Sequence, residues 1–211
     1  YGGAVREFVD AGVPEWSGRD GWCQLAADVF DAAVGFARGP VHLNLPFREP
    51  LLGDSFLDQV STDTLTRRAN RVAVSKSAID AISELCAGGN GVIVAGEGVA
   101  GSKHVLALAE ESQWPLLADS RSGLQDSGSA ICHADAILRE GSVADGLRPR
   151  VVLQFGEGPA SKVLNQFLHD GSTTVIQISD RPEERDPYRD VTSRMNADIS
   201  EVAKLIRRNG L

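Results

Sequence analysis

The feature that most constrains the fold is an alternation that begins near residue 71, between short apolar runs and stretches with helical periodicity. Runs of Val, Ile and Leu predict strands at 91–95, 116–118, 151–155 and 174–178. Helical patterns predict helices at 75–87, 102–112, 159–169 and 198–208, and a small helical piece near 134–140. Continuously apolar strands that alternate with amphipathic helices are typical of a parallel sheet with helices on both faces. We therefore predict a three-layer, Rossmann-like α/β domain over residues 71–211.

The first 50 residues follow a different pattern. A helix is predicted over 20–38, where Gly39 and Pro40 end it, and "VHLNL" (41–45) predicts a short strand. These elements cannot bury a sheet face alone, so we expect residues 1–50 to be the incomplete end of a preceding α/β domain. The segment 51–70 has mixed charge and no sustained period, which predicts a linker. Because the chain starts at Tyr1, we also expect it to be part of a longer protein.

Composition narrows the class of partner. The 211 residues are 42% hydrophobic and carry a net charge of -8, which argues against nucleic-acid or anionic membrane surfaces. No apolar stretch is long enough to predict a membrane span. The cysteines Cys23, Cys86 and Cys132 are far apart and lack metal-ligand spacing, so we expect a reducing, cytoplasmic environment.

A glycine-rich turn follows the strand predicted at 91–95. Gly96, Gly98 and Gly101 fit the dinucleotide pattern G-x-G-x-x-G, and Asp119 ends the next apolar run near the spacing expected for a ribose contact. One interpretation is an anion or nucleotide site at the start of the following helix. The alternative is a turn whose glycines serve only tight packing, with no ligand.

A second strand, turn and helix occurs in "VVLQFGEGPASKVLNQFL" (151–168). Gly156 and Gly158 predict a flexible turn, and Ser161 and Lys162 follow at the start of the helix. Backbone amides and a cation could together bind a carboxylate there. A solvated lysine is the alternative.

No other motif predicts a catalytic or metal site. The sequence lacks G-x-S-x-G and H-E-x-x-H, so it lacks the minimum parts of the common serine hydrolases and zinc proteases. Cys132, His133 and Asp135 lie together, but no second cluster completes a metal site. His42 is isolated on a short strand, where a structural hydrogen bond is its usual role.

Three segments together resemble one enzyme family. They are "GPVHLNLPFREPL" (39–51), "VVLQFGEGPASKVLNQFL" (151–168) and "DRPEERDPYRDVTSRMNAD" (180–198). They are similar to segments of the 2-succinyl-5-enolpyruvyl-6-hydroxy-3-cyclohexene-1-carboxylate synthases of menaquinone biosynthesis (MenD). The resemblance implies a thiamine-diphosphate enzyme with pyrimidine-binding, central and diphosphate-binding domains. This chain would then contain the end of the first domain, the linker and the central domain.

The family's reaction follows from the same resemblance. Its members decarboxylate 2-oxoglutarate on thiamine diphosphate and add the succinyl semialdehyde unit to isochorismate. The reaction needs a glutamate of the first domain and a G-D-G...N motif that binds magnesium in the third. No Gly-Asp-Gly occurs here. We therefore expect thiamine diphosphate and magnesium in the parent enzyme, with neither cofactor nor turnover in this chain alone.

The resemblance also implies partners and substrate contacts. The partners would be the remaining two domains, further copies in a homo-oligomer and small-molecule substrates. Lys162, with Ser161, matches the family's P-x-S-K pattern and would bind a substrate carboxylate. Gln154 departs from the family, in which arginine is common before F-G. Two alternatives remain, a free-standing nucleotide-binding or regulatory module and a structural domain for oligomer packing.

Overall fold

The computed structural model describes residues 1–35, 38–51, 73–99, 102–168, 172–181 and 186–210. It divides the chain into two compact units, residues 1–70 and 71–211. Apart from Leu51, the predicted linker lies outside the described residues. Within the described parts of the chain, no helix is long and apolar enough to cross a membrane.

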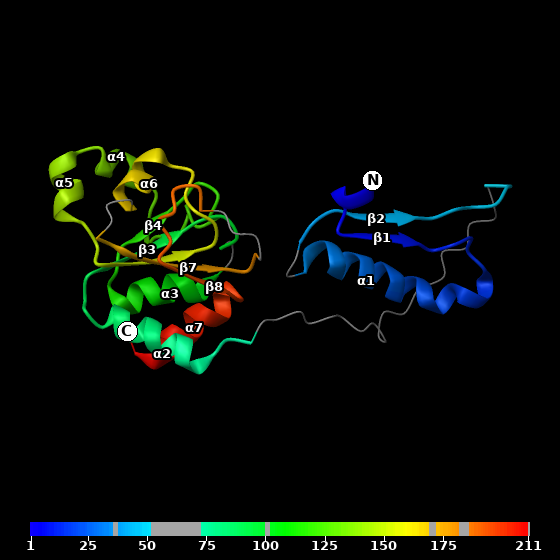
Figure 1. Ribbon diagram of the computed structural model, residues 1–211, viewed down its shortest axis with the longest axis horizontal. Coiled ribbons are helices and arrows are strands. Elements are labelled where there is room, and N and C mark those ends of the chain that lie inside the picture. Colours follow the sequence, from blue (N-terminus) through cyan, green and yellow to red (C-terminus); the bar gives the residue numbers. More distant parts are fainter. Residues whose placement is uncertain (36–37, 52–72, 100–101, 169–171, 182–185, 211) are drawn as a thin grey trace. The chain divides into compact units, whose positions relative to one another are not determined.

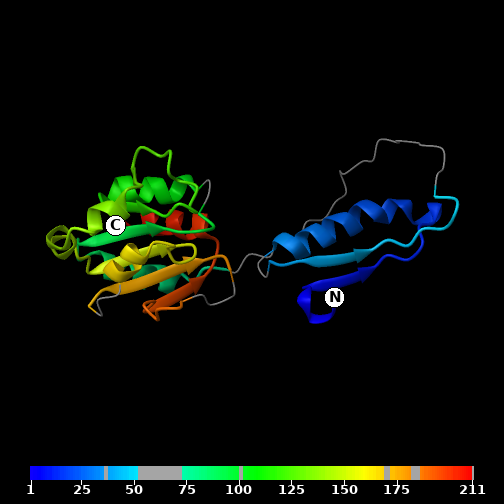
Figure 2. The same cartoon turned by 90° about the horizontal axis from the view of Figure 1, so that it is seen from above.

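The first unit contains a two-stranded parallel sheet and one α-helix (Figures 1 and 2). Strand β1 (Glu7–Asp10) pairs with β2 (Val41–Asn44), and helix α1 (Trp22–Val34) lies along them. Two 3-10 helices, Gly2–Ala4 and Trp16–Gly21, precede α1. The predicted strand is confirmed, and the predicted helix is present but ends at Val34, before Gly35, rather than at Gly39. Strand β1 was not predicted, because four alternating residues are too short a signal. None of the unit's described residues is buried.

The second unit is built on a six-stranded sheet in the order β5-β4-β3-β6-β7-β8, with every pair parallel. The strands are β3 (Gly91–Ala95), β4 (Leu116–Ala118), β5 (Ala130–Ile131), β6 (Val151–Phe155), β7 (Thr174–Ser179) and β8 (Ser193–Asn196). The predicted parallel α/β fold is confirmed. The two edge strands were not predicted, because β5 is only two residues long and β8 has the polar sequence SRMN.

Helices cover both faces of this sheet (Figure 1). One layer contains α2 (Lys76–Cys86), α3 (Lys103–Ser112) and α7 (Ile199–Asn209), and the other contains α4 (Ala134–Leu138), α5 (Gly141–Gly146) and α6 (Lys162–Leu168). Strand side chains alternate between the two layers, as the two-residue period requires. Ile93 and Leu153 join the α2, α3 and α7 core, whereas Val92 and Val152 face the α4 and α6 layer.

Two helices differ from the prediction. The helix expected over 159–169 begins only at Lys162, and residue 169 lies outside the described residues. Helix α5 was not predicted, because its sequence GSVADG begins and ends with glycine and lacks an apolar stripe.

A close contact marks the start of the central strand β3. The indole ring of Trp114 lies directly over Gly91, so a Cβ at that position would overlap the ring. Trp114 is only 7% exposed and packs within the core under α2, α3 and α7. Glycine at position 91 therefore makes room for the largest side chain of this core.

Candidate functional site

The sheet order identifies the place where a ligand would be expected. From β3 the chain proceeds to β4 and β5 on one side, and β6, β7 and β8 lie on the other side. In open parallel sheets, ligands bind outside the carboxyl ends of the strands at such a switch point. The candidate site is therefore formed by the loops that follow β3, β4, β6 and β7.

The loops that follow β3 and β6 pack directly on each other. The amide of Gly96 donates to the carbonyl of Phe155 at 2.8 Å, and the amide of Glu157 donates to the carbonyl of Glu97 at 3.0 Å. A Cβ on Gly96 would overlap the Glu157 carbonyl oxygen, and one on Gly156 would overlap that of Glu97. Gly96 and Gly156 thus let the backbones of the two loops pack against each other.

The glycines of the predicted nucleotide turn therefore have separable roles. Gly96 permits the close approach of the two loops. Gly98 has φ of +101°, a conformation that side-chain-bearing residues rarely adopt, while a Cβ there would lie 3.8 Å from Asp180. Gly101 lies outside the described residues. The two described glycines serve loop geometry, and any anion binding by this turn stays a prediction.

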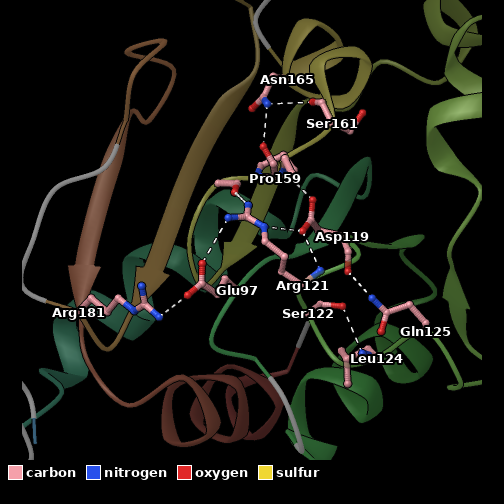
Figure 3. Close-up of polar contacts among 12 residues, drawn as sticks. Glu97, Asp119, Arg121, Ser122, Leu124, Gln125, Pro159, Ser161, Asn165 and Arg181 are labelled. Atoms are coloured by element: carbon pink, nitrogen blue, oxygen red, sulfur yellow. Dashed lines mark hydrogen bonds and ion pairs between the residues drawn. The ribbon is translucent and has the colours of Figure 1, made fainter. Parts of the chain in front are cut away.

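An arginine-carboxylate network, formed by Glu97, Asp119, Arg121 and Arg181, joins these loops (Figure 3). Arg121 donates to Asp119 at 3.1 Å, to Glu97 at 3.3 Å and to the carbonyl of Gly158 at 2.6 Å. Arg181 donates to the other oxygen of Glu97 at 2.6 Å. One guanidinium thus connects the loops after β3, β4 and β6.

Asp119, the predicted ribose ligand, lies at the centre of this network. Its side chain is 3% exposed. One oxygen accepts from the backbone and side chain of Arg121 at 3.0 and 3.1 Å, and the other accepts from the Ala160 amide at 2.6 Å (Figure 3). Both oxygens are therefore occupied by protein donors, and the aspartate fixes the turn before α6.

The network is electrically balanced. Two guanidinium groups face two carboxylates, so the network carries no net charge to attract a phosphate. Burial disfavours the charged form of Arg181, but the hydrogen bond and charge of Glu97, with the charges of Glu157 and Asp180, together raise the Arg181 pKa. The geometry is that of a structural clamp across the carboxyl edge.

The predicted substrate residues lie at the beginning of α6. The Ser161 hydroxyl donates to Asp135 at 2.5 Å and accepts from the amide of Leu164 at 3.0 Å, so it ties α6 to α4. Lys162 is exposed and has no hydrogen bond or ion pair with another described residue. The structure thus places Ser161 in a structural contact and leaves the Lys162 ammonium open to a ligand.

Several residues of the carboxyl edge were missed from the sequence. Glu97, Arg121, Glu157 and Arg181 each follow the end of a predicted strand by two or three positions. A search for charged residues at that offset would have found all four, since the carboxyl ends of parallel strands meet at one edge.

Comparison with known proteins identifies the family. A family model described as the middle domain of thiamine pyrophosphate matches residues 64–209. This chain belongs to that thiamine pyrophosphate middle-domain family. The sheet and its two helical layers are consistent with the Rossmann-like fold predicted for a middle domain.

Similar proteins extend this middle-domain match into the first unit. The 2-succinyl-5-enolpyruvyl-6-hydroxy-3-cyclohexene-1-carboxylate synthase of Listeria welshimeri is 31% identical over 99% of this chain and 38% of its own length. The synthase of Bacillus velezensis is 34% identical over 81% of the chain and 32% of its length. The synthase of Haloquadratum walsbyi is 32% identical over 96% of this chain and 36% of its own length. The predicted resemblance is confirmed, and the chain spans less than two fifths of these relatives.

The described residues of the second unit show no metal site for the family's cofactor. Among the described residues, no group of three or more His, Cys, Asp and Glu side chains could hold a metal ion. We therefore assign no step of thiamine diphosphate chemistry to the described residues.

Proposed function

We propose that this chain is the central part of a synthase that decarboxylates 2-oxoglutarate on thiamine diphosphate and adds the succinyl semialdehyde unit to isochorismate. The observation that carries the proposal is the similarity to the Listeria synthase over 99% of the chain, through both units. Magnesium in the parent enzyme, a homo-oligomer and a cytoplasmic location belong to the same proposal. So does the inactivity of this chain alone.

Within this function the second unit supplies a rigid support and one substrate contact. The arginine-carboxylate network holds together the loops at the carboxyl edge. Lys162 extends from the adjacent helix α6 with its ammonium free of any described partner. Both substrates are dianions, so we propose that Lys162 binds a substrate carboxylate through a charge-assisted hydrogen bond. Ser161 contributes by fixing the start of α6.

The test compares two lysines in the full-length parent enzyme. Lys162→Ala is expected to raise the Michaelis constant of at least one substrate by roughly ten- to a hundredfold, the effect of losing about 1.5–3 kcal/mol. Lys103→Ala is the matched control, because Lys103 is also an exposed first residue of a helix. Equal Michaelis constants in the two variants, with unchanged melting temperatures, would refute the role of Lys162. No turnover of either substrate by the wild-type parent would refute the function itself.

A separate measurement tests the cofactor part of the proposal. Calorimetric titration of this chain with thiamine diphosphate and magnesium is expected to show no binding, because the described residues include no cluster that could hold a metal ion. Binding with the affinity of the parent enzyme would contradict it. The nucleotide-module alternative stays a prediction, although both carboxylate oxygens of Asp119 already accept from Arg121 and Ala160.

A further inference from the structure

A row of polar side chains crosses the sheet on the face covered by α6. Gln154 of β6 pairs in register with Gln177 of β7, which pairs with Arg194 of β8. Two positions earlier, Val152 and Val175 belong to the apolar core of this same face. Because strand side chains alternate with period two, the glutamines point to the same side as these valines. The apolar layer therefore becomes polar toward the carboxyl ends of the strands.

Several polar atoms of this row lack hydrogen-bond partners. Gln154 is 4% exposed, and its side-chain amide bonds to no other residue that the structure describes. Gln177 donates to the carbonyl of Gly156 at 3.0 Å, but its buried Oε1 has no partner among the described residues. Glu157 accepts from Ser179 at 2.8 Å through Oε1, which also lies 3.9 Å from Nη2 of Arg194, while its buried Oε2 has no hydrogen-bond partner in the described chain. Buried polar atoms are normally satisfied, so such a group requires an explanation.

A cavity adjoins this row. It has a volume of about 180 Å³, and Gln154 and Glu157 line it together with the turn at Gly158. A Cβ built on Gly158 would lie 3.9 Å from Nε2 of Gln154, so the amide faces this turn. A single water needs only about 10–15 Å³ of such volume, so the cavity can hold a larger molecule. The unpartnered amide of Gln154 thus lines a space of ligand size.

The walls of the cavity indicate the chemistry of its ligand. Apolar contact surface comes mainly from Pro159, Leu168, Val175, Pro187, Tyr188 and Val191. Four carboxylates line it, those of Glu97, Glu157, Asp186 and Asp190, against the single guanidinium of Arg121. That guanidinium already donates to protein acceptors in three directions. Arg181 pairs with Glu97, and Arg194 lies 3.9 Å from Oε1 of Glu157. The four carboxylates still outnumber these three guanidinium groups, so the charge around the cavity opposes an anion.

We propose that this cavity binds a small planar molecule with N–H donors along one edge, uncharged or cationic, such as an amide or an amidine. The N–H edge donates to the side-chain oxygen of Gln154 and faces the carboxylates that line the cavity, while the ring lies against the prolines and Tyr188. This site goes beyond the proposed synthase reaction, because both substrates of that reaction are dianions. It needs no cofactor and no additional domain, so it can be tested on this chain.

The test uses benzamidine, benzamide and benzoate, which share one ring and the same number of non-hydrogen atoms. Amide NMR spectra of the full 211-residue chain are recorded during titration with each probe. Benzamidine and benzamide are expected to shift the Gln154 side-chain signal and the backbone signals of Val175 and Tyr188, with Kd on the order of 1 mM. Benzoate is expected to leave them unchanged. Benzoate binding as tightly as benzamide, or no shift with benzamidine, would overturn the proposal.

Two variants locate the site. Gln154→Met removes the amide at similar length and is expected to weaken both probes roughly three- to tenfold, the effect of losing one hydrogen bond. Gln166→Met is the control, because Gln166 is an exposed residue of the adjacent α6. If Gln154→Met does not fold, Tyr188→Ala replaces it as the test variant and is likewise expected to weaken both probes. Tyr188 is 49% exposed, and its loss removes one wall of the cavity. Binding within twofold of wild type in the folded variant would overturn the assignment.

Discussion

The main chains of Gly96 and Glu157 lie so close together that a Cβ at position 96 would overlap the Glu157 carbonyl oxygen. The contact joins the loops after β3 and β6, whose strands are hydrogen-bonded neighbours in the centre of the sheet. A glycine that resembles part of a nucleotide motif is thus explained by backbone packing. The contact also predicts that a single methyl group at position 96 lowers the stability of the second unit.

Gly96→Ala should lower the free energy of unfolding of the second unit by about 1–3 kcal/mol, because the obstructing atoms belong to the backbone and cannot rotate away. Urea unfolding measures the change. Gly128→Ala is the control, since Gly128 is exposed and a Cβ added there would have no heavy atom within 4 Å. That variant should stay within about 0.5 kcal/mol of wild type. Equal stabilities of the two variants would refute the packing role of Gly96.

Arg121→Met should lower the free energy of unfolding by about 1–3 kcal/mol, because it leaves the buried carboxylate of Asp119 without its charged donor. Arg121→Lys should not restore stability, since an ammonium cannot reach Asp119, Glu97 and the Gly158 carbonyl together. Arg139→Met removes an exposed i,i+4 ion pair and should have a much smaller effect. The clamp assignment fails if Arg121→Lys unfolds at the same urea concentration as wild type.

Ser161→Ala should destabilise the protein in a pH-dependent way. The Ser161 hydroxyl and then Arg139 hold the pKa of Asp135 below its ordinary value of 3.8. Because this pKa is lower in the folded protein, the stabilisation is present above the unfolded value and is lost as pH falls through the folded value. The melting-temperature difference from wild type should therefore narrow below pH 3.8.

The control for this prediction is made in an Asp135→Asn background. There Ser161→Ala still removes the acceptor for the Leu164 amide, so a pH-independent loss should remain. The pH-dependent part should vanish, because no carboxylate remains at position 135. A difference that widens toward low pH in the Asp135-containing protein would contradict the prediction.

Asp198→Ala should cost about 0.5–2 kcal/mol, because Asp198 caps α7 by accepting from the Glu201 amide at 2.8 Å. Helix α7 carries the fully buried Val202 and Ile206 into the core, so fraying of its first turn weakens that packing. Asp126→Ala, at an exposed loop position, should change the unfolding midpoint little. Similar midpoints for the two variants would exclude a capping role.

Backbone amides of β1 and β2 should exchange with solvent faster than those of β3 and β6. No described residue of the first unit is buried, whereas every residue of β3 and β6 is. Hydrogen exchange followed by mass spectrometry compares the two units within one sample. Equal protection of the two units would contradict this prediction unless another copy of the chain covers the first unit.

The central strands could be predicted because their sequences alone encode burial on both faces. The strands predicted at 91–95, 116–118 and 151–155 are β3, β4 and β6 with the same bounds. The edge strand β8 could not be predicted, because a strand with exposed positions needs no continuous apolar run. Its sequence SRMN takes strand form through pairing with β7.

The candidate site was predictable only in part. The turn at Gly96 and the exposed Lys162 could be found from short local patterns. The contacts of Arg121 could not, because its partners Glu97 and Gly158 are 24 and 37 residues away in the chain. The pairing of Gln154 with Gln177 likewise depends on strand register, which two separate apolar runs do not specify.

The position of Trp114 over Gly91 gives the second unit its own optical signal. Trp114 is 7% exposed, whereas Trp16 and Trp22 of the first unit are 68% and 42% exposed. A buried indole emits at shorter wavelength and is shielded from iodide, so quenching with iodide separates the two classes of tryptophan. Unfolding of each unit can therefore be followed by the fluorescence of the unlabelled protein.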